Sequence, residues 1–388
     1  MKEIKPLMIT NILCVSAMMA FLAVVGPIVR ELGLQEWHAG LSVALAGVAW
    51  TFLSRFWGKK SDYYGRKKIL ILGVFGFSLS YLILAIFINY AVVTPPLVII
   101  SLIMLILTRG IIGVFYSAIP PVSNALIADK VDVDSRTSYM AKLGAANGLG
   151  MILGPVFGAM FATYGLAIPL YAAAILPLIA VVILYFSLDS HSIIHLTKEK
   201  PLHIFDKRLR LPMIAAFLTM YSIVTTQICL GFYVIDKLSL ETIASAKTTG
   251  YILATVGVFF ILTQIVVSKF KSVTPNSWLS VGAVISSLGF IGVIFIDTKL
   301  ELFIAFSIVT IGLGMIIPAF LALTANSVLH HEQGVAAGTV SAAQGFGIIV
   351  GPLLSTFLYQ INIIAPFIVA AIAFVVLSVI SIKQKKEI

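Results

Sequence analysis

Charged residues are scarce in this sequence. Only 11% of its 388 residues are Asp, Glu, Lys or Arg, whereas 60% are hydrophobic, and the mean hydropathy is +1.07. A soluble protein of this composition would expose far too much apolar surface to water. The composition therefore excludes a soluble protein and indicates an integral membrane protein.

Other signals are absent as well. The two cysteines, Cys14 and Cys229, fall inside apolar runs, so no disulfide framework is expected. There is no P-loop, H-E-x-x-H or G-x-S-x-G pattern, which argues against direct ATP drive and against an enzyme. Neither a metal site nor a cofactor is predicted. The formal net charge is +10, but no cation cluster lies on a separate soluble domain, so nucleic-acid binding is not expected.

What the sequence does contain is a series of apolar runs of about 20 residues, the length that crosses a bilayer as a helix. They are too long for the alternating strands of a β-barrel. The first run follows Lys2 and Lys5 but exceeds a signal-peptide core, so we expect it to stay as a helix. The predicted fold is an all-α integral membrane protein with twelve transmembrane helices, at residues 7–29, 38–57, 69–89, 96–118, 137–162, 168–188, 211–235, 248–268, 276–296, 301–323, 334–358 and 362–382.

The cations predict the orientation of these helices. When the connections are assigned alternately to two sides, most of the 26 Lys and Arg residues fall on the side of the N-terminus. The other side receives only Arg30, Lys237, Lys247 and Lys299. By the positive-inside rule both termini are cytoplasmic. We expect a multi-pass protein of the cell membrane, specifically a bacterial inner membrane.

An internal repeat divides the chain into two halves. The segment "NGLGMILGPVFGAMF" from Asn147 matches "QGFGIIVGPLLSTFL" from Gln344 in its glycine and Gly-Pro spacing. The predicted organisation is a six-helix half at 1–188, a polar cytoplasmic linker at 189–210 and a second six-helix half at 211–388. Two six-helix halves of this kind typify rocking transporters with a site near the midplane.

Two segments carry a family resemblance. The connection "GKKSDYYGRKK", Gly58–Lys68, resembles the loop signature of the major facilitator superfamily, and "GMILGPVFGA", Gly150–Ala159, resembles the fifth-helix signature of its twelve-helix drug:proton antiporters. Ala159 stands where that signature ends in glycine. A looser match, "LTRGIIG", contains Arg109 and resembles their fourth-helix motif.

The resemblance implies a conformational latch in the first connection, with Gly58 allowing close approach to a helix of the other half. Asp62 and Arg66 are spaced for an i,i+4 pair if the segment is helical. The bland alternative is that the cations only set the topology. The predicted latch residues are Gly58, Asp62, Gly65, Arg66 and Lys67.

The fifth-helix signature places small residues every four positions, which presents a smooth helix face for close packing. Pro155 and Pro352 each remove a backbone hydrogen bond and bend their helices. We predict that these two kinked seams form where the halves meet. The predicted seam residues are Gly150, Gly154, Pro155, Gly158, Gly351 and Pro352.

Arg109 lies near the middle of its span, where a charge is costly. We expect it to face a wet cavity and to serve coupling or substrate binding, the alternative being a pairing with backbone carbonyls. Every one of the 16 acidic residues falls at a span end or in a loop, so the cavity should have positive potential. Asp129 or Asp236 could carry a proton, although a solvated loop acid is the simpler reading of Asp129. The remaining candidate cavity residues are Arg55, Arg30, Asn11, Asn147, Tyr221, Gln227, Asn326 and Gln344.

Together these observations predict a secondary transporter working by alternating access. The favoured interpretation is a monomeric, proton-coupled exporter of small amphipathic, zwitterionic or anionic molecules, either drug-like compounds or siderophore-type metabolites. A solute importer of the same superfamily is the alternative within transport. A membrane receptor or scaffold that transports nothing is the alternative outside it.

Overall fold

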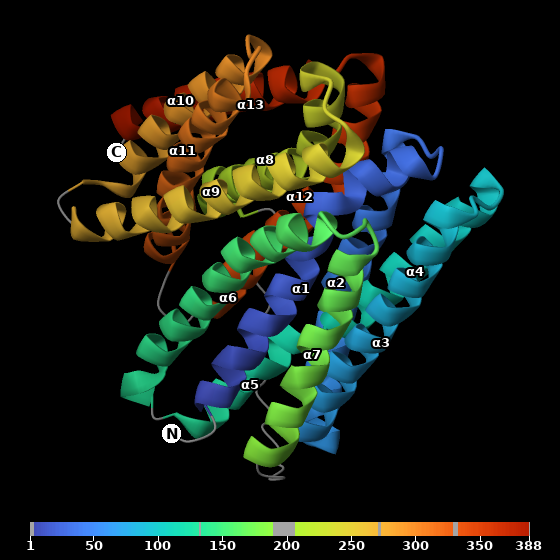
Figure 1. Cartoon of the computed structure of the whole chain (residues 1–388). Coiled ribbons are helices and arrows are strands. Elements are labelled where there is room, and N and C mark those ends of the chain that lie inside the picture. Colours follow the sequence, from blue (N-terminus) through green and yellow to red (C-terminus); the bar gives the residue numbers. More distant parts are fainter. Residues whose placement is uncertain (1–3, 132, 189–205, 271–272, 329–332, 388) are drawn as a thin grey trace. The chain divides into compact units, whose positions relative to one another are not determined.

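The computed structural model describes residues 4–131, 133–188, 206–270, 273–328 and 333–387, and the described residues form helices and no strands (Figure 1). Within these described ranges, twelve stretches are long and apolar enough to cross a membrane, which confirms the predicted number of spans. The helices are α1 (Ile4–Glu31), α2 (Glu36–Tyr64), α3 (Arg66–Val93), α4 (Val98–Tyr116), α5 (Ile119–Lys130), α6 (Val133–Ala162), α7 (Ile168–Ser187), the 3-10 turn η1 (Lys207–Leu209), α8 (Arg210–Leu238), α9 (Thr242–Lys269), α10 (Pro275–Ile294), α11 (Lys299–Asn326), α12 (Gln333–Ile361) and α13 (Ala365–Glu387).

The fourth span consists of two helices. Helix α4 ends at Tyr116 and α5 starts at Ile119 with Pro120 in its first turn. Proline lacks the backbone N–H that would continue the ladder, so it is tolerated in a first turn but interrupts a continuous helix. The apolar stretch nevertheless continues to Ile127, nine residues beyond the predicted end of that span.

Helices generally extend past the predicted apolar runs. The clearest case is α2, which we expected to end at residue 57 and which continues to Tyr64. The segment Gly58–Tyr64 is therefore the last two turns of a helix, and only Gly65 separates it from α3. Gly65 has φ +95° and ψ 139°, a backbone conformation that side chains with a Cβ disfavour.

The chain divides into two compact units whose boundary does not follow the sequence halves. The first unit holds Met1–Leu196 together with Leu240–Ala254, and the second holds Thr197–Ser239 together with Thr255–Ile388. Helix α9 therefore begins in one unit and ends in the other. In the first unit, Thr242 at the start of α9 donates a 2.8 Å hydrogen bond to Glu31 at the end of α1.

Each unit contains a closely packed helix pair built to the same spacing. A Cβ added at Gly150 or Gly154 of α6 would meet Ile12, Val15, Ser16 and Met19 of α1. At Gly347 and Gly351 of α12 it would meet Phe217, Met220, Tyr221 and Val224 of α8. The intervals between contacted residues are the same on α1 and α8, so the sequence repeat corresponds to a repeated helix packing.

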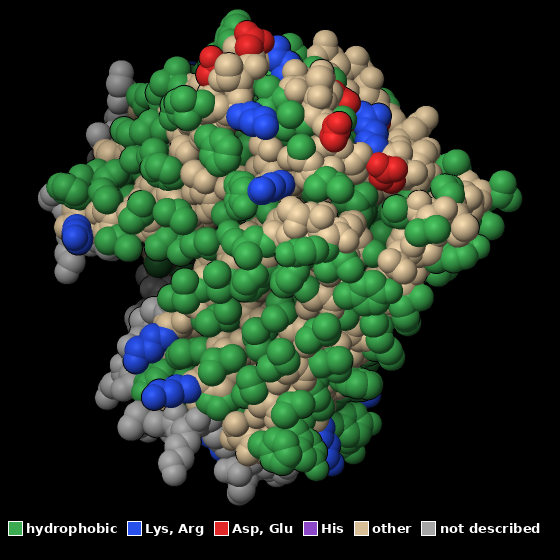
Figure 2. Space-filling view, viewed as in Figure 1, with side chains coloured by type: hydrophobic (Ala, Val, Ile, Leu, Met, Phe, Trp, Pro, Cys, Tyr) green, Lys and Arg blue, Asp and Glu red, His purple; other side chains and the backbone are tan. Residues whose placement is uncertain are grey.

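The outer surface of the first unit is apolar. Figure 2 shows hydrophobic side chains over most of the visible face of its helices. Phe186 and Val93, for example, are 81% and 78% exposed. Large apolar patches of this kind mark a surface that lipid covers.

Candidate functional site

The corner between α2 and α3 is set by Gly65. Its N–H donates a 3.1 Å hydrogen bond to the carbonyl of Ser61, closing α2, and α3 begins at the next residue. The sharp turn places the last carboxylate of α2, Asp62, beside the first side chain of α3, Arg66. The predicted i,i+4 ion pair between them is present.

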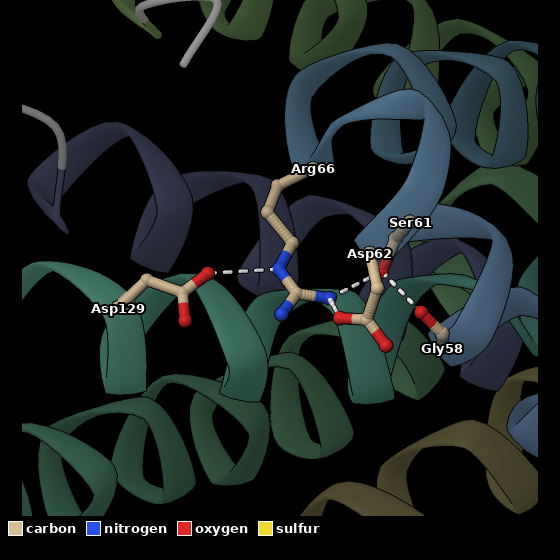
Figure 3. Close-up of polar contacts among 5 residues, drawn as sticks. All are labelled: Gly58, Ser61, Asp62, Arg66 and Asp129. Carbon is tan, nitrogen blue, oxygen red and sulfur yellow. Dashed lines mark hydrogen bonds and ion pairs between the residues drawn. The ribbon is translucent and has the colours of Figure 1, made fainter. Parts of the chain in front are cut away.

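Arg66 is the centre of a polar cluster, which we call the Arg66 cluster (Figure 3). Besides pairing with Asp62, its Nη1 donates to Ser61 Oγ at 2.6 Å and its Nε donates to Asp129 Oδ2 at 2.9 Å. Ser61 Oγ in turn donates to the carbonyl of Gly58 at 2.7 Å. One guanidinium thus joins the end of α2, the start of α3 and the end of α5.

Asp129 corrects the sequence interpretation. We considered it a solvated loop acid, but it lies in α5 with its side chain only 10% exposed, against 12% for Arg66. A carboxylate so far removed from water needs a charged or hydrogen-bonding partner. The signal that could have found it is the short apolar run at residues 125–128 directly before it, on the predicted side of the cations of the first connection.

Lys67 contacts backbone carbonyls, whereas its neighbour Arg66 pairs with carboxylates. Its Nζ donates to the backbone carbonyls of Tyr185 and Leu188 at 2.8 and 2.5 Å, and it lies 5.4 Å from the Tyr185 ring centroid. These carbonyls are at the C-terminus of α7, where a cation complements the helix dipole. Lys67 therefore fixes the end of α7 to the start of α3.

The Cβ position of Gly58 faces open space among the described residues. A Cβ added there would have no heavy atom within 4 Å. The approach to a helix of the other half that the family resemblance implies for Gly58 stays a prediction.

Arg109 is buried rather than exposed to water, contrary to expectation. The residue is 1% exposed. Its Nη1 donates to Tyr81 Oη of α3 at 3.2 Å, and its Cζ lies 4.1 Å from the ring centroid of Phe21 on α1. Its Nε has no hydrogen-bond partner among the described residues. The guanidinium is thus held by one aromatic face and one phenol, and the described part of the chain provides it with no carboxylate.

The other predicted cavity residues are distributed over both units. In the first, Asn11 donates to the Leu7 carbonyl at 2.9 Å and to Ser123 at 3.1 Å. Arg30 pairs with Glu36 at 2.6 Å. Arg55 is exposed near the end of α2, and the buried amide oxygen of Asn147 has no hydrogen-bond partner in the described part of the chain.

In the second unit, Tyr221 is 3% exposed and its hydroxyl has no partner among the described residues. Gln227 and Gln344 are half-buried and Asn326 is exposed. Asp236, the second acid that we considered for proton transfer, accepts a 2.9 Å hydrogen bond from Tyr359. Within each unit these side chains form separate contacts rather than one constellation.

The glycine faces pack against helices of their own half, and the predicted seam between the halves stays a prediction. Gly150, Gly154 and Gly158 contact α1, and Gly351 contacts α8, so these glycines bring together helices of the same unit. Pro155 and Ala159, on the same helix α6, contact α9. A Cβ at Gly250 of α9 would lie 2.6 Å from the Pro155 carbonyl and would clash with Ala159. Helix α9 belongs to the second sequence half, so Pro155 and Ala159 contact a helix of that half.

The comparisons with known proteins agree with this architecture. The sequence model of the Major Facilitator Superfamily matches residues 7–340 and, in a second match, 238–386. Multidrug resistance protein 2 of Bacillus subtilis is 26% identical, with 87% of this chain and 84% of the relative covered. Quinolone resistance protein NorA of Staphylococcus aureus is also 26% identical, with coverages of 88% and 86%. The crystal structure of the peptide transporter POT in complex with sulfate superimposes with a TM-score of 0.81 at 15% identity, covering 100% of this chain and 94% of that one.

Proposed function

The chain belongs to the major facilitator superfamily, and on that premise we propose that this multi-pass membrane transporter is a proton-coupled exporter working by alternating access. The names of the relatives, multidrug and quinolone resistance proteins, support export of small molecules. The proposal also places both termini on the cytoplasmic side. It includes two moving halves joined by the linker 189–210, and a protein that works as a monomer.

The observation that carries the cargo class is the environment of Arg109. A cation at the centre of a span is costly unless something offsets its charge. Arg109 is 1% exposed, and no described acid pairs with it. A transported carboxylate would supply the missing negative charge, which favours anionic or zwitterionic amphipathic molecules, including siderophore-type chelators. A purely cationic drug would add to the charge that has to be offset.

Proton coupling is assigned to acids at the span ends. Asp62 and Asp129 share one arginine, so protonating either leaves Arg66 with one carboxylate and loosens the α2–α5 contact. Asp236 with Tyr359 is the corresponding candidate in the second unit. An ion pair that exists in one conformation and is released by a proton in the other is a way to couple a gradient to movement.

The test is proton movement in proteoliposomes that contain a pH dye, while cationic, zwitterionic and anionic compounds are added in turn. Proton flux with an anionic or zwitterionic compound, lost in Arg109→Ala, supports the proposal. Flux with cations alone contradicts the cargo class. Compound uptake along with protons, in vesicles whose protein orientation is known, would identify the importer alternative.

A further inference from the structure

The cytoplasmic end of α2, as the positive-inside rule orients it, presents an exposed face of aromatic and cationic side chains. Phe52 is 71% exposed, Phe56 46%, Tyr63 77% and Tyr64 50%. Lys59 is exposed as well. Positions spaced by three and four residues lie on one face of a helix, so these side chains and Lys60 form a single surface, which we call the α2 aromatic face.

Lys60 lies within this face between two rings. Its Nζ is 5.6 Å from the ring centroid of Phe56 and 5.1 Å from that of Tyr64. Both distances fall within the range of a cation–π contact. The two rings are one turn before and one turn after the lysine, so the ammonium is held in place along the helix rather than extended into solvent.

The cations of this face differ from the other cations of the same corner. Arg66 pairs with two acids and Lys67 donates to two backbone carbonyls. For Lys59 and Lys60 the described residues provide neither a hydrogen-bond acceptor nor an acid. The nearby acid Asp62 is engaged by Arg66. The face therefore carries positive charge that the described part of the chain does not offset.

The place of this face along α2 indicates what offsets the charge. The helix enters the membrane as an apolar span and reaches Lys59 and Lys60 just past the predicted apolar run, at the level of the lipid headgroups. Aromatic rings are favoured at that level, and lysines there attract anionic lipids. Rings that pack on the upper acyl chain and ammonium groups that reach a phosphate match the two ends of a phospholipid.

We propose that the α2 aromatic face is a binding site for an anionic phospholipid, with its phosphate at Lys60 and Lys59 and its glycerol and upper acyl chains against Phe56, Tyr63 and Tyr64. The site is separate from the cargo proposal, because none of these side chains belongs to the Arg66 cluster or contacts Arg109.

The test is a titration of the delipidated full-length protein with phosphatidylglycerol or phosphatidylcholine, followed by native mass spectrometry. We expect phosphatidylglycerol to bind more tightly. Lys60→Gln should weaken the tightest phosphatidylglycerol site by about fivefold, the effect of one cation near an anionic surface. Lys60→Arg should retain it. Lys269→Gln, which removes the same charge from another exposed position, should leave that site unchanged.

Photoactivatable phosphatidylglycerol then locates the site, since crosslinked peptides should contain residues 52–64 in the wild type and lose that label in Lys60→Gln. Equal binding of both lipids, or equal losses in Lys60→Gln and Lys269→Gln, would overturn the proposal. So would a protein dimer that dissociates in Lys60→Gln, because the occupant of the face would then be a second copy of the chain.

Discussion

Arg66 and Asp129 are 63 positions apart in the sequence, and their side chains meet at 2.9 Å. The contact fastens α5 to the corner of α2 and α3. Because Arg66 also pairs with Asp62, a change in either acid alters the contact between α2 and α5.

Asp129→Asn should destabilise the first unit. The side chains of Arg66 and Asp129 are 12% and 10% exposed, and breaking a buried ion pair costs about 3 kcal/mol at the low end of its range; the low end applies because Asp62 still pairs with Arg66. Thermal unfolding in detergent measures the loss. Asp297→Asn is the matched control, because its side chain is 83% exposed in its pair with Lys237. Equal melting temperatures for the two variants would contradict a structural role for Asp129.

Asp62→Asn should reduce transport more than it reduces stability. Its side chain is 37% exposed, so the folded state loses little when the charge is removed. The proposed latch, however, depends on that charge. Transport rates in proteoliposomes, normalised to inserted protein, measure the effect, and Asp62→Glu should restore part of it. Normal transport in Asp62→Asn would remove the latch argument.

Gly65→Ala and Gly58→Ala should have opposite consequences. At φ +95° an alanine is strained by roughly 1–3 kcal/mol, so Gly65→Ala should lower the melting temperature. Gly58 is helical with open space around its Cβ position, so alanine there should fold at least as well. If Gly58→Ala folds normally and still loses transport, close approach to the other half is supported; unchanged transport would show that Gly58 is dispensable.

Gly154→Ala should be more damaging than Gly351→Ala. A Cβ at Gly154 would lie 2.5 Å from the Ser16 carbonyl and 2.6 Å from Met19, whereas at Gly351 its nearest contacts are at 3.3 Å. Forcing extra carbon into a closely packed interface typically costs about 1–3 kcal/mol. Unfolding of the two variants in the same detergent tests the order, and a larger loss for Gly351→Ala would contradict it.

Arg109→Lys should keep the charge but lose most transport. A lysine cannot reproduce the flat guanidinium packed on Phe21 or its directed donor to Tyr81. Proteoliposome transport is the measurement, and Arg55→Lys, at an exposed position, is the control that should remain active. Full activity in Arg109→Lys would mean that only the positive charge matters at this position.

Much of the fold could be predicted because the membrane imposes a length on every span. The helix ends could not, since a helix continues wherever its backbone is satisfied and not only where its side chains are apolar; α2 passes through Lys59 and Lys60 for this reason. The Asp62–Arg66 pair was predictable from its spacing. Asp129 was not, because its approach to Arg66 depends on the break between α4 and α5.

The glycine contacts show the same limit. Spacing every four residues correctly predicts that a neighbouring helix comes close. It does not say which helix, because α1 and α9 both have small residues that allow a close approach to α6. The burial of Arg109 likewise depends on Phe21 and Tyr81, which lie on two other helices and carry no local signal in the sequence.

The position of helix α9 determines what happens when the chain is split into two fragments at the linker. A fragment that ends in the linker would leave Pro155 and Ala159 without Gly250, and the complementary fragment would carry the turns before Ala254 without their support. Two genes cut at the linker would therefore produce pieces that each lack part of a packed interface. Co-expressed, those pieces would recover their missing contacts by reassembling through the first turns of α9.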